Sequence, residues 1–236
     1  SIRRQRQMCI RDRTSPVLLY HKVDPWPELG ITRTTPRGFR RQMEYLACSG
    51  FTGCSLESLP GFNKTSTHPR SSTEVQARLV ALTFDDGYQS VFRHALPVLN
   101  SYGFNGTVFV PVNFIGLSNT WDAGRFGLRF RHMDIEQLRE WIDSGGRVGC
   151  HTGAHRHLML VPEEERRDEI IDAKHRLEDT LGTGITSFAP PFGWYDRNVL
   201  ELCREAGYLQ VAVVGLRKHI PVPVSYTHLR AHETKA

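Results

Sequence analysis

Short apolar runs alternate with helical stripes along the chain from residue 16 onward. The run at residues 79–84 is apolar without alternation, which is typical of a strand buried on both faces. Most of the other runs are bounded by glycine, proline or polar residues, as strands usually are. The pattern predicts strands at residues 17–20, 51–56, 79–84, 106–112, 147–150, 185–189 and 209–214.

The segments between these runs carry signals for helix ends. Asp134 and Gln137 form a capping-box pattern, and Gly50 and Gly182 stand where helices should end. Pro97 should bend or restart its helix, because proline lacks the N–H that an inner helical turn needs. Helices are therefore predicted at residues 36–49, 91–102, 135–144 and 162–181 and after Asp196, with a Ser-, Thr- and Pro-rich loop at residues 60–73.

This alternation predicts an α/β fold with a parallel sheet, either an α/β barrel or a doubly wound sheet. Both architectures gather their chemistry at the C-terminal ends of the strands. Such ends carry His21, Asp85, Asp86, His151 and the PPFG turn at residues 190–193. We therefore expect these residues to form one site.

Asp85 and Asp86 are adjacent carboxylates at the end of the run at residues 79–84. Consecutive residues of a regular strand point to opposite faces, but Gly87 permits a sharp turn that would bring both acids to one cavity. One carboxylate could then bind a metal while the other accepts a proton. A solvated turn is the alternative interpretation of this doublet taken alone.

The sequence HTGAH offers two imidazoles, His151 and His155. Residues four apart reach the same side if the segment turns helically. Two imidazoles and one carboxylate leave coordination positions open for water and substrate, and zinc is the usual occupant, although cobalt or nickel also suits these ligands. With 11 histidines in the chain, a chance pair is the alternative, and His157 is interpreted as a bystander.

The charge distribution argues against a nucleic-acid partner. The formal charge of +5 comes from the two ends, since residues 1–13 carry +4 and residues 224–236 carry +1, which leaves the body neutral. No apolar run is long enough to span a membrane. The cysteines show no CxxC spacing, so they indicate neither a zinc ribbon nor a disulfide framework.

Both ends resemble translated sequencing-adapter read-through and read as no part of a fold. We therefore expect residues 1–13 and 224–236 to be non-native segments around one domain at residues 14–223. Basic disordered tails are the alternative. On the first interpretation the native termini are missing, and the lack of a visible signal peptide carries no information.

Three motifs in order resemble the polysaccharide deacetylases with a NodB-homology domain, carbohydrate esterase family 4. They are TFDDG at residues 83–87, HTGAH at residues 151–155 and FAPPFG at residues 188–193. The opening LLYHKVDP is similar to the YHxV branch, which includes bacterial poly-N-acetylglucosamine deacetylases. The resemblance implies a distorted (β/α) barrel, incomplete at its C-terminus, with residues 14–223 as a truncated catalytic domain.

The resemblance also implies roles for individual residues. Asp85 matches the catalytic base, and Asp86, His151 and His155 match the ligands of a divalent metal ion, with zinc the expected one. Phe192 stands where the family has a tyrosine whose backbone N–H stabilises the oxyanion, and a backbone donor survives that change.

Further roles are expected around this centre. His21 matches an N-terminal histidine that acts as general acid in the YHxV branch. Pro191, Trp194 and Trp121 are expected to bind substrate. One position departs from the family, because Ala189 replaces an arginine that pairs with the catalytic aspartate in many members, which should leave the pKa of Asp85 less depressed.

The resemblance implies removal of acetyl groups from N-acetylated sugars of a polysaccharide such as chitin, peptidoglycan or poly-N-acetylglucosamine. O-deacetylation of acetylated xylan and an inactive carbohydrate-binding homologue are the alternatives. A DxD-type phosphate hydrolase is a poorer one, since DDG lacks the second spaced acid. The expected partner is a polysaccharide or oligosaccharide, and the family favours the cell envelope or another extracytoplasmic location.

Overall fold

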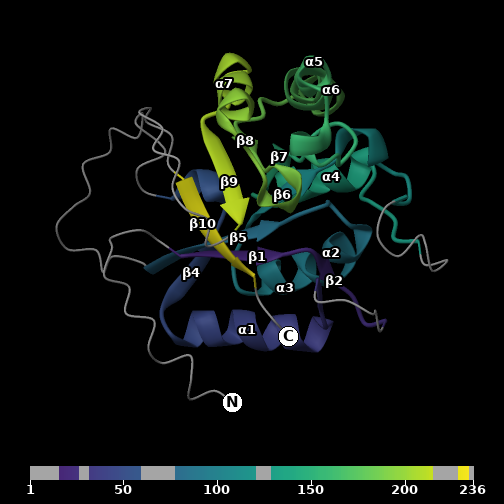
Figure 1. Cartoon of the computed structure of the whole chain (residues 1–236). Helices are drawn as coiled ribbons and strands as arrows, with labels where there is room; N and C mark the ends of the chain where they lie inside the picture. The colour runs from purple at the N-terminus through teal and green to yellow at the C-terminus, as the bar shows by residue number, and fades with distance from the viewer. Residues whose placement is uncertain (1–15, 27–31, 60–77, 121–128, 215–227, 234–236) are drawn as a thin grey trace.

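A parallel sheet that curls back on itself forms the centre of the molecule (Figure 1). The computed structural model describes residues 16–26, 32–59, 78–120, 129–214 and 228–233 of the 236-residue chain. The strands are β1 (Val17–Tyr20), β4 (Phe51–Cys54), β5 (Arg78–Phe84), β6 (Thr107–Val110), β7 (Arg147–Cys150), β8 (Ser187–Phe188), β9 (Gln210–Val214) and β10 (His228–Glu233).

The order of these eight strands is β1-β10-β9-β8-β7-β6-β5-β4. Because β1 also pairs with β5, in register from Val17 opposite Ala81 to Tyr20 opposite Phe84, the sheet closes into a barrel. This closure selects the distorted (β/α) barrel over the doubly wound sheet, and all the barrel pairings are parallel, as predicted. A separate two-stranded sheet pairs β2 (Lys22–Val23) with β3 (Arg33–Thr34).

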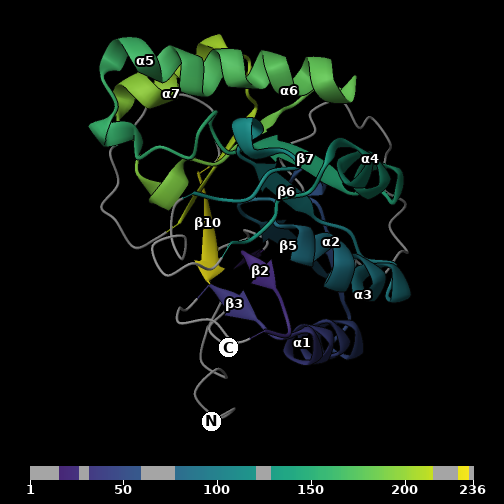
Figure 2. The ribbon, with the colours of Figure 1, turned by 90° about the vertical axis from the view of Figure 1, so that its right-hand side faces the viewer.

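Helices follow most of the strands and lie on the outside of the barrel (Figure 2). They are α1 (Pro36–Cys48), α2 (Gln89–His94), α3 (Leu96–Ser101), α4 (Ile135–Asp143), α5 (Glu163–Arg167), the π-helical turn η6 (Asp168–Asp172), α6 (Ala173–Leu181) and α7 (Arg197–Glu205). Short 3-10 turns add η2 (Leu56–Ser58), η3 (Val112–Phe114), η5 (Leu158–Leu160) and η7 (Pro191–Gly193). No helix in the described parts of the chain is both long and apolar enough to cross a membrane.

The predicted helix-end signals are largely confirmed. Asp134 and Gln137 form the capping box of α4, and Asp196 accepts the Val199 N–H at the start of α7. The helix is interrupted at Ala95, between α2 and α3 and two residues before Pro97. This break lies at the site where proline was expected to interrupt the helix.

The strands are buried on both faces, which explains the apolar run of β5. Ala81 faces the barrel interior, where Phe109 fills the space between small residues, while Val80, Leu82 and Phe84 face the helices. This alternation follows from the two-residue period of a strand.

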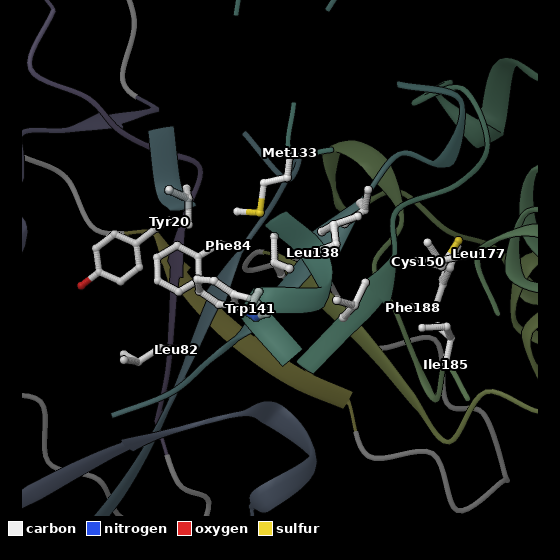
Figure 3. Packing of buried hydrophobic residues seen from close by; sticks show 14 of the residues in the cluster. Tyr20, Leu82, Phe84, Met133, Leu138, Trp141, Cys150, Leu177, Ile185 and Phe188 are labelled. Atoms are coloured by element: carbon white, nitrogen blue, oxygen red, sulfur yellow. The ribbon is translucent and has the colours of Figure 1, made fainter. Parts of the chain in front are cut away.

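Aromatic side chains pack among the aliphatic ones in the layer between barrel and helices. Trp141 of α4 packs edge-on against Phe84 of β5, with ring centroids 5.5 Å apart (Figure 3). Its indole N–H donates to the Arg147 carbonyl at 3.1 Å, so its polar atom is satisfied in the core. Cys150 is also buried here as a free thiol, in agreement with a packing role.

Part of the C-terminal segment belongs to the sheet, contrary to expectation. The strand β10, at residues 228–233, pairs in parallel with both β9 and β1 and fills the gap between them. Two open strand edges can accept any extended segment through backbone hydrogen bonds, which do not depend on its side chains. The expectation that residues 224–236 lie outside the fold is therefore wrong for these six, while their non-native origin stays a prediction.

Two other expectations fall outside the described residues. These are the non-native segment at residues 1–13 and the loop at residues 60–73. Among the described elements, the strand predicted at residues 51–56 ends at Cys54, because the chain turns into the 3-10 helix η2.

Candidate metal centre

The turn after β5 brings the two aspartates into one site. Asp86 has a φ of 67° and Gly87 a φ of 62°, so two consecutive residues adopt the left-handed conformation. The sequence suggested Gly87 as the source of the turn, but Asp86 itself contributes equally. The Asp85 N–H donates to the Tyr20 carbonyl at 2.8 Å, which ties this end of β5 to the end of β1.

The loop after β7 carries the two histidines without a helical turn. Thr152 and His155 have φ values of 69° and 55°, both in the left-handed region. The segment does not turn helically, which was one way to place both rings on the same side; two left-handed residues, with Gly153 and Ala154 between them, bring the rings together instead. The His155 N–H donates to the Thr152 hydroxyl at 3.0 Å, which stabilises the compact loop.

Three side chains from these two loops converge. Asp86 Oδ1 lies 3.0 Å from His155 Nε2 and 3.5 Å from His151 Nε2. Each of Asp86, His151 and His155 offers one potential ligand atom, and these three atoms all lie within 4.8 Å of one another. Among the residues that the structure describes, this is the only group of three or more such side chains that could hold a metal ion.

The hydrogen bonds around His151 leave its Nε2 available for a metal. Its Nδ1 lies 2.7 Å from the Ala189 carbonyl, which can only accept, so Nδ1 carries the proton. A metal-binding histidine usually donates its other N–H in this manner, which fixes the tautomer and the ring orientation. The lone pair on Nε2 therefore points toward Asp86.

The electrostatics of the site favour a cation. Burial opposes ionisation of Asp86, which is 4% exposed, but its contacts with His151 and His155 outweigh burial and hold its pKa well below the ordinary value. Burial raises the pKa of Asp85, although His151 and His21 act in the opposite direction. Burial also opposes the charged form of His151, yet Asp86 and Asp85 raise its pKa.

The donor set fits a divalent metal ion. Asp86 Oδ1 is buried and has no hydrogen-bond partner in the part of the chain that the structure describes. A buried carboxylate oxygen facing two imidazole nitrogens is satisfied when a cation lies between them. Two nitrogen ligands and one oxygen ligand leave coordination positions for water and substrate.

The other expected site residues lie close to this centre, with one exception. His21 directly follows β1, and its charge influences both aspartates. Phe192 adopts a φ of 60° in η7, and its exposed ring contacts His155 with centroids 5.2 Å apart. Pro191 is buried beside it. Trp121 lies outside the described residues.

His157 has more contacts than a bystander would. Its ring stacks on Phe192 at 5.6 Å and lies 5.6 Å from the ring of Trp194. These three rings lie beside the loop at residues 151–155, which we call the metal loop. Together we call them the aromatic wall. The only sequence signal was the position of His157 two residues after His155.

His132 also contacts this centre, although no motif or spacing pointed to it. Its Nδ1 lies 2.6 Å from the carbonyl oxygen of Asp86, and its ring stacks on Tyr88 and lies near Phe114. Since a carbonyl only accepts, His132 Nδ1 donates. Burial lowers the pKa of His132, in keeping with a neutral ring. It therefore supports the left-handed backbone of Asp86, a member of the candidate metal-binding group.

Known proteins with similar sequences are deacetylases. YxkH of Bacillus subtilis (strain 168), which bears the name "putative polysaccharide deacetylase", is 25% identical over 193 residues, which are 82% of this chain and 62% of YxkH. The peptidoglycan-N-acetylglucosamine deacetylase PgdA of Listeria monocytogenes is 26% identical over 144 residues, 61% of this chain and 27% of PgdA. The chain thus spans less than two thirds of the length of either relative.

Solved structures share the fold over nearly the whole chain. The deacetylase PplD of Streptococcus pyogenes superimposes with a TM-score of 0.73 at 19% identity, covering 94% of this chain and 92% of PplD. IcaB of Ammonifex degensii gives a TM-score of 0.71 at 25% identity, with 93% and 91% coverage.

The family model for polysaccharide deacetylase matches residues 72–211, which is more than half of the chain. This range contains Asp85, Asp86, both histidines of the metal loop and Phe192. The chain belongs to the polysaccharide deacetylase family.

Proposed function

We propose that this protein is a metal-dependent hydrolase that removes acetyl groups from N-acetylated sugars of a polysaccharide. The observation that carries the proposal is the buried group of Asp86, His151 and His155 with a second buried carboxylate, Asp85, next to it in the chain. The name of the relative PgdA supports N-acetylglucosamine units as the substrate class. Such substrates favour the cell envelope or another extracytoplasmic location.

Asp86, His151 and His155 would hold the metal ion, and we propose zinc because its common sites combine imidazole and carboxylate ligands. A divalent cation supplies Lewis-acid polarisation of an acyl carbonyl and of water. The tautomer of His151, set by the Ala189 carbonyl, keeps Nε2 ready to bind it.

Asp85 is the proposed general base. It removes a proton from the water molecule whose oxygen forms a bond to the acetyl carbonyl carbon. It is 7% exposed, and the link from its N–H to Tyr20 fixes the backbone that carries it. The carboxylate that accepts the proton is therefore held separately from the carboxylate that binds the metal.

Two further groups complete the proposed reaction. The Phe192 backbone N–H donates to the oxygen that gains negative charge. When the carbon–nitrogen bond breaks, His21 donates a proton to the departing sugar amine, and the products are acetate and the free amine. The position of His21 at the end of β1, within electrostatic reach of both aspartates, supports this role.

Aromatic side chains are the proposed sugar-binding surface. Trp194 and the ring of Phe192, with His157 between them, form the aromatic wall beside the metal loop. Flat apolar rings suit the apolar faces of pyranose sugars. We propose Pro191 and Trp121 as further substrate contacts on the basis of the family resemblance.

The test is acetate release from N-acetylglucosamine oligosaccharides and, in parallel, from acetylated xylan. Activity should fall after treatment with a chelator and return with zinc. Asp85→Asn should lose at least 100-fold in kcat, at the lower end of what general base catalysis contributes, which is about 10²–10⁴-fold. Asp179→Asn, the same change at an exposed position of α6, is the matched control and should remain active.

Each arm can contradict the proposal. Faster release from xylan would assign the enzyme to O-acetyl substrates. A folded protein that binds no divalent ion and releases no acetate would be an inactive carbohydrate-binding homologue. Full activity of Asp85→Asn would remove this residue from the mechanism.

A further inference from the structure

A buried glutamate outside every sequence motif contacts the loop that carries both metal-binding histidines. Glu169 lies in η6, the π-helical turn between α5 and α6, and is 6% exposed. Carboxylates are rarely buried to this degree unless they are paired or hydrogen-bonded. Turns of π-helix are uncommon and occur frequently at functional sites.

Glu169 hydrogen-bonds two consecutive residues of this loop. Its Oε2 accepts the Ala154 N–H at 2.8 Å, and its backbone carbonyl accepts the Gly153 N–H at 3.1 Å. Gly153 and Ala154 lie directly between the left-handed residues Thr152 and His155. One residue of the helix thus binds the centre of the loop through both its side chain and its main chain.

The loop conformation requires such support. A non-glycine residue in the left-handed region costs about 1–2 kcal/mol, and this loop contains two of them, Thr152 and His155. Such strain persists only where the surroundings fix the backbone. The contact is also close, since a Cβ on Gly153 would lie 3.3 Å from Glu169 Oε2 and 3.1 Å from Arg176 Nη2. A larger residue at Gly153 would therefore require these two side chains to shift.

We propose that Glu169 is a positioning residue whose carboxylate, through the Ala154 N–H, holds His151 and His155 in the arrangement that binds a divalent cation. The inference rests on the metal centre of the proposed function, but it concerns the geometry of the loop. It requires an acceptor oxygen at the Ala154 N–H rather than a negative charge.

Three substitutions separate position from charge. Glu169→Gln keeps an acceptor oxygen at the same distance from the backbone and removes the charge. Glu169→Asp keeps the charge but shortens the side chain by one methylene, which moves the carboxylate away from the Ala154 N–H. Glu169→Leu removes the acceptor. A cavity of about 580 Å³ borders Glu169, so water can enter when the side chain is shortened. Glu164→Gln is the matched control, because Glu164 is exposed on the neighbouring helix α5.

The first measurement is the affinity of the metal-free protein for zinc, by competition with a chromophoric chelator, with circular dichroism to confirm folding. Glu169→Asp and Glu169→Leu should bind zinc about 10–100-fold more weakly, as changes in groups that support metal ligands generally do. Glu169→Gln and Glu164→Gln should remain within threefold of the wild-type protein. If Glu169→Leu does not fold, the comparison of Asp with Gln decides.

The second measurement, hydrogen exchange at the Ala154 amide, needs neither metal nor substrate. Exchange should accelerate in Glu169→Asp and stay slow in Glu169→Gln. Unchanged exchange and unchanged zinc affinity in folded Glu169→Asp would overturn the inference, and so would equal weakening by Gln and Asp. A wild-type protein that binds zinc but releases no acetate would instead contradict the proposed function and leave this inference intact.

Discussion

Replacing His132 should weaken metal binding only where the hydrogen bond to Asp86 is lost. The ring of His132 performs two separable tasks, since it stacks on Tyr88 with centroids 4.9 Å apart and donates from Nδ1 to the Asp86 carbonyl at 2.6 Å. His132→Phe keeps an aromatic ring and removes the donor. His132→Asn keeps a nitrogen donor at the same number of bonds from the backbone and removes the ring.

The expected magnitude follows from these contacts. Leaving the Asp86 carbonyl without its buried donor costs about 1–3 kcal/mol. Asp86 already occupies a left-handed conformation, with a φ of 67°, so relaxation of its backbone would move the metal-binding carboxylate. If the whole cost falls on the metal-bound state, zinc affinity drops about 5–150-fold in His132→Phe. His132→Asn should bind zinc within a factor of three of wild type.

Calorimetric zinc titration of the metal-free proteins measures affinity, and urea unfolding measures stability separately. Both variants should lose stability, His132→Asn because it leaves space beside Tyr88 and His132→Phe because it buries an unpaired carbonyl. The reasoning is refuted if folded His132→Phe binds zinc as tightly as wild type, or if both variants lose affinity equally.

Three further predictions concern the framework of the fold. Trp141→Ala should lower the free energy of unfolding in urea by about 3–5 kcal/mol, because the indole is fully buried; a loss under 1 kcal/mol would contradict its place in the core. Asp134→Ala should cost about 1 kcal/mol in thermal unfolding through loss of the α4 cap, and Asp134→Asn should recover most of it. Burial opposes ionisation of Glu178, but the Ile185 N–H and the Lys174 ammonium outweigh it and lower the pKa of this carboxyl. The stability that ionised Glu178 contributes to the fold is therefore present above the unfolded-state pKa and is lost as pH falls through the folded-state pKa. Glu178→Gln should therefore flatten the acid limb of the stability–pH profile, and an unchanged limb would exclude Glu178 as its source.

Local periodicity was sufficient to predict most of the barrel. The run at residues 79–84 became β5 (Arg78–Phe84), buried on both faces, because both sides of a barrel strand meet apolar neighbours. The capping box at Asp134 was readable because all its contacts lie within four residues. The convergence of Asp86 and His151 followed from the shared edge of parallel strands.

Features that depend on distant contacts were not predictable. The carbonyl of the left-handed Asp86 accepts from His132, 46 residues away, and the Gly153 N–H donates to the Glu169 carbonyl. A lone buried histidine or glutamate shows no local spacing that separates a supporting role from ordinary packing. The loop after His151 is held both by a local bond from the His155 N–H to the Thr152 hydroxyl and by the distant Glu169, and the second of these contacts has no local sequence signal.

The departure at Ala189 can be reconciled with an intact metal centre. The residue binds His151 Nδ1 through its carbonyl, and its own N–H donates to the Cys150 carbonyl at 3.0 Å. Both bonds use the backbone and therefore do not depend on which side chain stands there. The Ala189 methyl group meanwhile packs in the barrel interior near Phe109. Compared with the arginine that the family resemblance implies, alanine provides no cation beside Asp85 but leaves the hydrogen bond to His151 Nδ1 in place, so the consequences should be confined to proton transfer by the proposed base.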